Sequence, residues 1–136
     1  MTTRDQVVAM ARTCLGVRFR HQGREPEQGL DCVGLVIYTR KQLGLSSFDY
    51  LNYAHTPDPA KLIELLRAEL VPIEIDEVQP GDVLHFRVGN NPVHVGLATD
   101  NGVIHSVANL RGVVEHRLDD EWRSRIVAAY QIPGVS

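Results

Sequence analysis

The sequence lacks the features that define several common protein classes. Its two cysteines, Cys14 and Cys32, are too few for a disulfide scaffold, and their spacing fits no zinc-finger pattern. It also lacks an excess of positive charge, because 14 basic and 17 acidic residues give a net charge of −3. This balance excludes the basic surface expected of a protein that binds nucleic acid or anionic membranes.

Long hydrophobic runs are absent as well, so we expect no membrane insertion. The N-terminus has no apolar stretch that would act as a secretory signal, which predicts synthesis in the cytosol with both thiols reduced. Internal repeats, low-complexity tracts and blocks of like charge are missing too. With 136 residues, 43% of them apolar, the chain is expected to form one globular domain over residues 1–136.

Helical periodicity dominates the first half of the sequence, and a period of two dominates the second half. In the first half we predict a helix over residues 7–15 that Gly16 stops, followed by a polar loop over residues 17–30. A second helix is capped by Asp31 and ended by Gly44. An irregular segment over residues 45–57 then leads to a third helix, which begins at Asp58-Pro59. The predicted strands cover residues 82–88, 94–99, 103–107, 113–118 and 126–132, with one helical turn after Asp119-Asp120. This order predicts an α+β fold.

Cys32 is the candidate nucleophile. It falls in the first turn of a predicted helix, where unpaired backbone N–H groups and the helix dipole favour a thiolate and lower the thiol pKa. Gly34 has no side chain, and the space that this leaves beside Cys32 would give a substrate room. The alternative is that Cys32 is a small buried apolar residue at a helix start.

A thiolate nucleophile needs a base, and the base needs a group that orients it. His94 and His105, on consecutive predicted strands, are the candidates, although histidine is also simply tolerated at strand ends. A two-residue turn at Asn101-Gly102 would leave the two histidines four residues out of register, roughly 13 Å apart. A longer loop, over residues 99–102, offsets them by two residues, about 7–8 Å between backbones. The catalytic interpretation therefore predicts the second register.

The other histidines carry less information. We expect His55, His85 and His116 at solvated or half-exposed positions and assign them no role. His21, in the loop before Cys32, either lines the cleft or is an ordinary polar loop residue. A competing interpretation is a zinc hydrolase that uses Cys32 and the two strand histidines as ligands. No His-Glu-x-x-His motif supports it, so we expect no metal and no cofactor.

Taken together, these residues carry a resemblance to a known family that extends over about residues 4–132. Four segments resemble motifs of the NlpC-type cell-wall cysteine peptidases: Asp31-Cys32-Val33-Gly34-Leu35-Val36, Pro80-Gly81-Asp82-Val83-Leu84-His85-Phe86, His94-Val95-Gly96-Leu97 and Val103-Ile104-His105-Ser106. The resemblance implies a papain-like fold, in which the helix carrying the cysteine packs against a five- or six-stranded antiparallel sheet. It also implies a thiol protease that hydrolyses an amide bond in the peptidoglycan stem peptide, commonly between D-glutamate and the diamino acid. Cys32 would be the nucleophile, His94 the general base and then acid, and His105 the group that orients His94.

Departures from the family pattern concern the substrate. The usual serine after the cysteine is Val33, the usual upstream tyrosine is Phe19, and the stretch between the two histidines is one residue shorter than is common. We take Phe19, His21, Asp31 and Val33 as the candidate substrate-binding residues.

Two further segments resemble the branch of this family found in tailed bacteriophages: Arg18-Phe19-Arg20-His21-Gln22-Gly23-Arg24 and Arg111-Gly112-Val113-Val114-Glu115-His116. The resemblance implies a component of the virion tail tip or of tail assembly, with other tail-tip proteins as partners and the cell wall as target. The absence of a secretory signal agrees with a phage component made in the host cytoplasm. The alternative function is a structural tail-tip module, a plug or docking domain that is slow or inactive as an enzyme.

Overall fold

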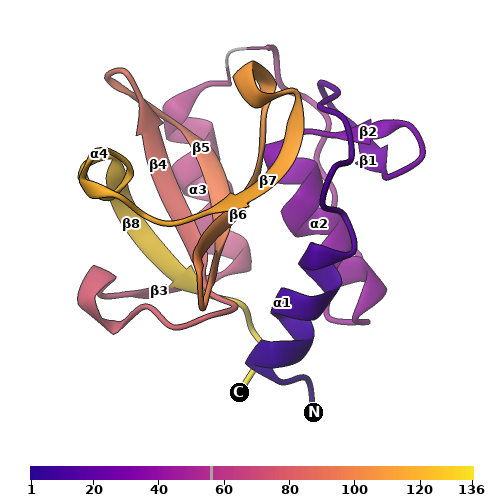
Figure 1. Cartoon of the computed structure of the whole chain (residues 1–136), viewed down its shortest axis with the longest axis vertical. Helices are drawn as coiled ribbons and strands as arrows, with labels where there is room; N and C mark the ends of the chain where they lie inside the picture. Colours follow the sequence, from indigo (N-terminus) through magenta and orange to yellow (C-terminus); the bar gives the residue numbers. More distant parts are fainter. Residues whose placement is uncertain (56) are drawn as a thin grey trace.

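The computed structural model describes residues 1–55 and 57–136. Its helices are α1 (Arg4–Arg12), α2 (Cys32–Gln42), α3 (Pro59–Glu69) and α4 (Asp120–Ser124), and its strands are β1 (Arg24–Glu25), β2 (Gly29–Leu30), β3 (Val71–Ile73), β4 (Val83–Val88), β5 (Asn91–Thr99), β6 (Gly102–Val107), β7 (Gly112–His116) and β8 (Ile126–Gln131). Short 3-10 turns cover Ile75–Glu77 and Ala108–Leu110. The helices come first and the antiparallel sheet follows, so the predicted α+β fold is confirmed (Figure 1).

The main sheet has six antiparallel strands in the order β3-β8-β4-β5-β6-β7. Two features of the strands were not predicted from the sequence. β3 is a three-residue edge strand paired with β8, and the predicted polar loop over residues 17–30 contains the small antiparallel ribbon β1-β2. Of the segment 45–57, predicted to be irregular, the described residues form no helix or strand, and Thr56 lies outside them.

Side-chain caps explain where the long helices begin. Thr3 and Gln6 form a reciprocal capping box at α1, Asp31 accepts a hydrogen bond from the Gly34 N–H at α2, and Asp58 accepts one from the Ala60 N–H at α3. Each satisfies a backbone donor that the first turn of a helix leaves unpaired. The predicted caps at Asp31 and Asp58 are confirmed.

The core consists of two clusters on opposite faces of the sheet. The larger one packs the apolar faces of α1, α2 and α3 against the sheet, with Leu35, Leu97 and Ile104 fully buried at its centre. The smaller one gathers Leu84 and Phe86 with residues of the segment around α4. None of the helices among the described residues is long and apolar enough to cross a membrane.

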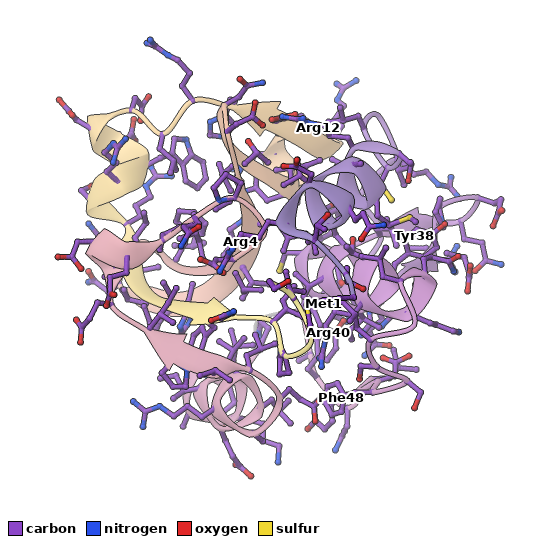
Figure 2. All side chains as sticks on the ribbon, turned by 90° about the horizontal axis from the view of Figure 1, so that it is seen from below. Met1, Arg4, Arg12, Tyr38, Arg40 and Phe48 are labelled. Atoms are coloured by element: carbon purple, nitrogen blue, oxygen red, sulfur yellow. The ribbon has the colours of Figure 1, made fainter. Side chains whose placement is uncertain are left out.

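Two arginines of α1 form salt bridges with carboxylates of the sheet and of the β5–β6 turn (Figure 2). Arg4 Nη1 lies 2.7 Å from Asp82 Oδ1, at the start of β4. Arg12 reaches two carboxylates, with Nη2 at 2.8 Å from Glu115 Oε2 of β7 and 2.6 Å from Asp100 Oδ1 of the β5–β6 turn. α1 therefore holds β7, an edge strand of the sheet, next to the β5–β6 turn. That turn sets the register between β5 and β6.

The β5–β6 hairpin has the register that the catalytic interpretation requires. Leu97 pairs with Ile104 and Thr99 with Gly102, so the predicted two-residue offset between the histidines is confirmed. The Thr99 hydroxyl accepts hydrogen bonds from the N–H groups of Asn101 and Gly102, both at 3.1 Å, and donates one to Glu115. Asp100 and Asn101 thus form a two-residue turn, one residue earlier than the Asn-Gly alternative. The predicted longer loop over residues 99–102 is wrong, because Thr99 and Gly102 pair within the strands, although the register that it was expected to give is correct.

Candidate active site

Cys32 is the first residue of α2, and Asp31 fixes the loop in front of it. The Asp31 carboxylate accepts hydrogen bonds from the N–H groups of Gly34 and Gln22, from the Arg24 guanidinium and from the Tyr53 hydroxyl. These four donors occupy both oxygens of a buried side chain. Asp31 was expected to bind substrate, but it has internal partners and serves to hold the start of α2.

The sulfur of Cys32 lies against β5. The Val95 N–H faces it, as do the N–H groups of Val33 and of Cys32 itself, and these donors favour the thiolate. Burial outweighs them and, with the nearby Asp31 carboxylate, raises the pKa of the Cys32 thiol to about 12. The expectation of a lowered pKa is therefore wrong for the unliganded protein. The residue as a whole is half-buried, so the site has access to solvent.

His94 and His105 are brought together as predicted. His94 of β5 and His105 of β6 project from the same face of the sheet, and His94 Nε2 lies 2.7 Å from His105 Nδ1. Both side chains are buried, and burial is the main cause that lowers the pKa of each imidazole. Among the described residues no hydrogen bond joins Cys32 to His94; the sulfur faces the backbone amide of the following residue, Val95.

The row of histidines continues to a third member that was not expected. His116 of β7 was expected to be solvated or half-exposed and was assigned no role. It is half-buried, and its Nε2 lies 2.9 Å from His105 Nε2. The ring of Trp122, from α4, packs against this row, with its centroid 4.9 Å from that of His105 and 5.2 Å from that of His116. The sequence holds a signal for the third histidine, because positions 94, 105 and 116 are equally spaced by 11 residues.

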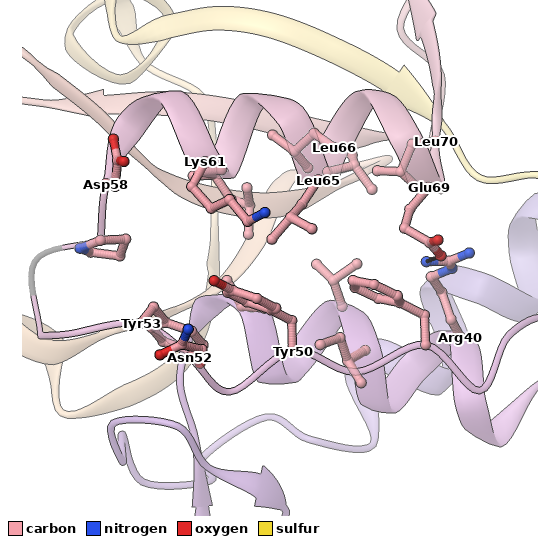
Figure 3. A pocket seen from close by; sticks show the side chains of 18 of the residues that line it. Arg40, Tyr50, Asn52, Tyr53, Asp58, Lys61, Leu65, Leu66, Glu69 and Leu70 are labelled. Carbon is pink, nitrogen blue, oxygen red and sulfur yellow. Dashed lines mark hydrogen bonds and ion pairs between the residues drawn. The ribbon is translucent and has the colours of Figure 1, made fainter.

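A cavity of about 480 Å³ opens along α2 (Figure 3). It runs between α2, α3 and the segment that carries Phe48, Tyr50 and Tyr53, with the Arg40–Glu69 ion pair at one end. Val33 and Val95, the residues whose amides face the Cys32 sulfur, belong to its lining. Val33, a candidate substrate-binding residue, thus lines this cavity.

The two remaining candidate substrate-binding residues lie at the loop before α2. Phe19 is half-buried and its backbone bridges to Leu30, and its N–H donates to the Arg111 carbonyl. His21 packs edge-on against Tyr53, with ring centroids 5.4 Å apart, and stacks on His55 at 3.9 Å. Tyr53 was not singled out from the sequence, yet it places a phenol beside Asp31, close to the nucleophile.

Two other expectations need correction. His85 is buried rather than solvated, because β4 is an interior strand, and its Nε2 donates to the Pro92 carbonyl at 2.8 Å. Gly34 does not leave room for a substrate. A Cβ at this position would come within 2.0 Å of the Gly23 carbonyl oxygen, so the missing side chain lets the preceding loop pack on α2.

The zinc interpretation does not match the histidine geometry. Both ring nitrogens of His105 face other histidines, at 2.7 and 2.9 Å, which are hydrogen-bond distances. Within the described part of the chain, no group of three or more histidine, cysteine, aspartate or glutamate side chains is arranged to hold a metal ion. The arrangement suits proton transfer between neighbouring rings.

A cysteine at the start of a helix, placed against a sheet that carries hydrogen-bonded histidines, defines the papain-like class of α+β domains. Comparison with known proteins narrows this class. The NlpC/P60 family matches residues 16–131, and the chain belongs to this family, whose members are cell-wall peptidases.

Two curated relatives have similar sequences. The chain is 30% identical over 121 residues to the probable endopeptidase NlpC of Escherichia coli (strain K12), which covers 86% of this chain and 70% of that protein. It is 24% identical over 138 residues to the gamma-DL-glutamyl hydrolase of Bacillus subtilis (strain 168), covering 96% of this chain. The chain spans only 30% of the length of the latter relative.

Solved structures share the fold. An NlpC/P60 family protein from Bacillus cereus ATCC 10987 superposes with a TM-score of 0.72 at 19% identity, covering 95% of this chain and 40% of that one. The NlpC/P60 domain of the peptidoglycan hydrolase SagA gives a TM-score of 0.68 at 19% identity, covering 95% of this chain and 98% of that one. The papain-like NlpC fold expected from the sequence motifs is confirmed.

Proposed function

We propose that the chain is a cysteine endopeptidase that hydrolyses an amide bond in the stem peptide of peptidoglycan. Cys32 is the nucleophile, His94 the general base and then acid, and His105 the group that orients His94. The observation that carries the proposal is the 2.7 Å hydrogen bond between His94 Nε2 and His105 Nδ1. The Cys32 sulfur faces the amide of Val95, the residue after His94.

Acylation forms a thioester. The Cys32 sulfur attacks the carbonyl carbon, and the thiol proton passes to His94 Nδ1, directly or through one water. The carbonyl oxygen becomes an oxyanion that accepts hydrogen bonds from backbone N–H groups at the start of α2, including that of Cys32. The carbon–nitrogen bond then breaks, and His94 gives its proton to the departing amine.

In deacylation, water is the nucleophile and the Cys32 sulfur is the leaving group. Water attacks the thioester carbonyl and loses a proton to His94, the carbon–sulfur bond breaks, and the Cys32 sulfur takes the proton back as the acid leaves. Because burial raises the pKa of the Cys32 thiol and lowers that of the His94 imidazole, the resting pair is neutral. Proton transfer therefore accompanies the attack, rather than preceding it as a stored ion pair.

The bond between D-glutamate and the diamino acid is the proposed target. The name of the Bacillus subtilis relative, a gamma-DL-glutamyl hydrolase, agrees with cleavage next to a glutamyl residue. The cavity is lined by Val33 and Val95, whose amides face the sulfur, and it offers an apolar wall for the substrate. Since Val33 replaces a hydroxyl residue and Phe19 a phenol, contacts to the peptide rely on backbone groups and on Tyr53.

We also propose that the chain acts in a bacteriophage tail tip, made in the host cytoplasm and carried to the cell wall with the particle. The support is the resemblance of two segments, and these lie side by side: Arg18 bridges to Gly112, and the Phe19 N–H donates to the Arg111 carbonyl. Labelling particles with an antibody to the chain tests this placement. Label on the tail tip supports the proposal, and particles without label contradict it.

The enzymatic proposal is tested with a defined muropeptide and mass spectrometry of the products. The chain should release two fragments separated at the bond after D-glutamate, and Cys32→Ala should abolish the release. Cys14→Ala is the matched control, because Cys14 lies buried in the core outside the site and its loss should leave cleavage intact.

Other outcomes would assign the chain differently. If the wild-type chain leaves the muropeptide intact while Cys32→Ala particles assemble normally, the chain is a structural tail module. If a chelator stops cleavage and a thiol alkylator does not, the zinc interpretation is correct and the cysteine mechanism is wrong.

A further inference from the structure

Three histidines form a continuous row across three adjacent strands. His94 on β5, His105 on β6 and His116 on β7 are joined by contacts of 2.7 and 2.9 Å between ring nitrogens. Each contact is diagonal, because the ladder pairs His105 with Val114 and places His116 opposite Val103, two residues further along. The row ends at the backbone, where His116 Nδ1 lies 2.8 Å from the Arg117 carbonyl oxygen.

When all three rings are neutral, that carbonyl determines the direction of every hydrogen bond in the row. A carbonyl oxygen only accepts, so the proton of a neutral His116 ring is on Nδ1 and its Nε2 must accept. His105 then donates from Nε2 and accepts at Nδ1. His94 in turn donates from Nε2, which leaves the lone pair of His94 on Nδ1.

This tautomer of His94 is the one that general-base catalysis needs. A neutral imidazole takes a proton only at its unprotonated nitrogen, and the opposite tautomer would direct an N–H at the reacting thiol. His105 cannot exchange partners with solvent, because it is fully buried under Trp122 and Phe86. Among the described residues of the row, His116 is the most accessible member, half-buried on the edge strand.

We propose that His116 is a positioning residue: anchored on the Arg117 carbonyl, it holds His105 and His94 in the tautomers that leave His94 Nδ1 free to accept the Cys32 proton. The catalytic consequence rests on the proposed cysteine peptidase function. The tautomer order itself does not depend on any activity. The salt bridge between Arg12 and Glu115, the neighbour of His116, keeps β7 in the position that this row requires.

Nitrogen NMR of the histidine rings in the full chain tests the order directly, because the two nitrogens of a neutral imidazole have distinct shifts. We expect His116 as the Nδ1–H tautomer and His105 and His94 as Nε2–H tautomers. His94 found as Nδ1–H in the wild-type chain would overturn the proposal.

Substitutions test the consequence. His116→Leu removes the acceptor, so His94 should become a mixture of tautomers and kcat on a muropeptide should fall on the order of tenfold to a hundredfold, with KM within about twofold. His116→Gln keeps an acceptor oxygen at a similar reach and should recover most of the lost rate. Arg117→Ala is the matched control, since it changes the adjacent side chain and retains the carbonyl.

The outcomes separate the two proposals. If the ring shifts match and His116→Leu scrambles His94 while the wild-type chain cleaves nothing, the peptidase function fails and the positioning role of His116 stands. If cleavage is robust and His116→Leu changes neither kcat nor the His94 tautomer, His116 has no such role. Should His116→Leu fail to fold, the wild-type ring shifts and His116→Gln still decide the question.

Discussion

The thiol of Cys32 illustrates how much a single residue depends on its surroundings. Its position at the start of a helix can be read from the sequence, because Asp31 is a recognisable cap and Gly34 belongs to the motif. The dipole and amides at that position favour a thiolate. Burial against β5 and the carboxylate of Asp31 oppose this and raise the pKa. The burial comes from β5, which is distant in the chain, so the sequence alone predicted the wrong direction for this pKa.

Alkylation of Cys32 measures the balance between these influences. A thiol reacts as its thiolate, and a pKa raised to about 12 means that the thiolate fraction grows with pH throughout the accessible range. We expect the second-order rate with iodoacetamide, followed by mass spectrometry on the Cys14→Ala variant, to rise about tenfold per pH unit between pH 7 and 9. A fast rate that is level from pH 6 upward would instead show a thiolate–imidazolium pair in the resting site.

His116 shows a different limit at the residue scale. The equal spacing of the three strand histidines is visible in the sequence, but spacing alone does not place rings within 3 Å. The contact requires the β6–β7 register, which pairs His105 with Val114 and depends on the turn over Ala108–Leu110. That turn carries Arg111 with a positive φ of 67°, a conformation that no local pattern indicated.

At the scale of elements, local signals predicted most of the helices and strands. Asp58-Pro59 marks the start of α3, and period-two patterning marks β4 to β8. The missed elements are those without a local signal: β3 is three residues long and contains Pro72, and β1-β2 lies in a polar loop held by Asp31 and Arg24. β3 forms because β8 offers it a partner, whereas β1 and β2 pair with each other inside the loop.

The β5–β6 hairpin is the element on which the candidate site depends most. Replacing Thr99 by valine keeps the shape but removes the hydroxyl that accepts from the N–H groups of Asn101 and Gly102 and donates to Glu115. We expect the free energy of unfolding to fall by about 1 to 3 kcal/mol, measured by urea denaturation. We also expect the His94–His105 contact to weaken, seen as a change in their ring nitrogen shifts.

Thr13→Val is the control for this substitution. The Thr13 hydroxyl donates to the Met10 carbonyl at an exposed helix end, so its removal should change stability by less than about 0.5 kcal/mol. If Thr99→Val were as mild as Thr13→Val and left the histidine shifts unchanged, the hydroxyl would not be what selects the register.

At the scale of the whole molecule, the sheet joins residues that the chain keeps far apart. Cys32 comes from the helical half, while the three histidines come from consecutive strands of the other half. Phe86 and Trp122, on the face of the sheet that α4 covers, pack against the row, which excludes water from His105. The same enclosure that orders the hydrogen bonds also makes it costly to charge these rings.

This cost predicts an acid-sensitive fold. Burial lowers the pKa of His85, His94 and His105 in the folded protein, whereas in the unfolded chain each imidazole titrates near pH 6.5. Below that value the unfolded state binds more protons than the folded state, so stability falls as the pH falls. Each histidine that stays neutral to pH 5 contributes a loss of about 2 kcal/mol relative to pH 7.

Urea denaturation at pH 7, 6 and 5 measures this loss of stability. Because the measurements end at pH 5, the titration of carboxylates at lower pH does not contribute to it. The hydrogen bond from Arg12 lowers the pKa of the Glu115 carboxyl, and its effect on stability begins only near the ordinary value of 4.5 and below. His94→Phe removes one of the titrating rings and should make the dependence on pH shallower by about 2 kcal/mol over the same window. A free energy of unfolding that is equal at pH 7 and pH 5 would mean that the buried rings accept protons at little cost, and the neutral row of histidines would then be wrong.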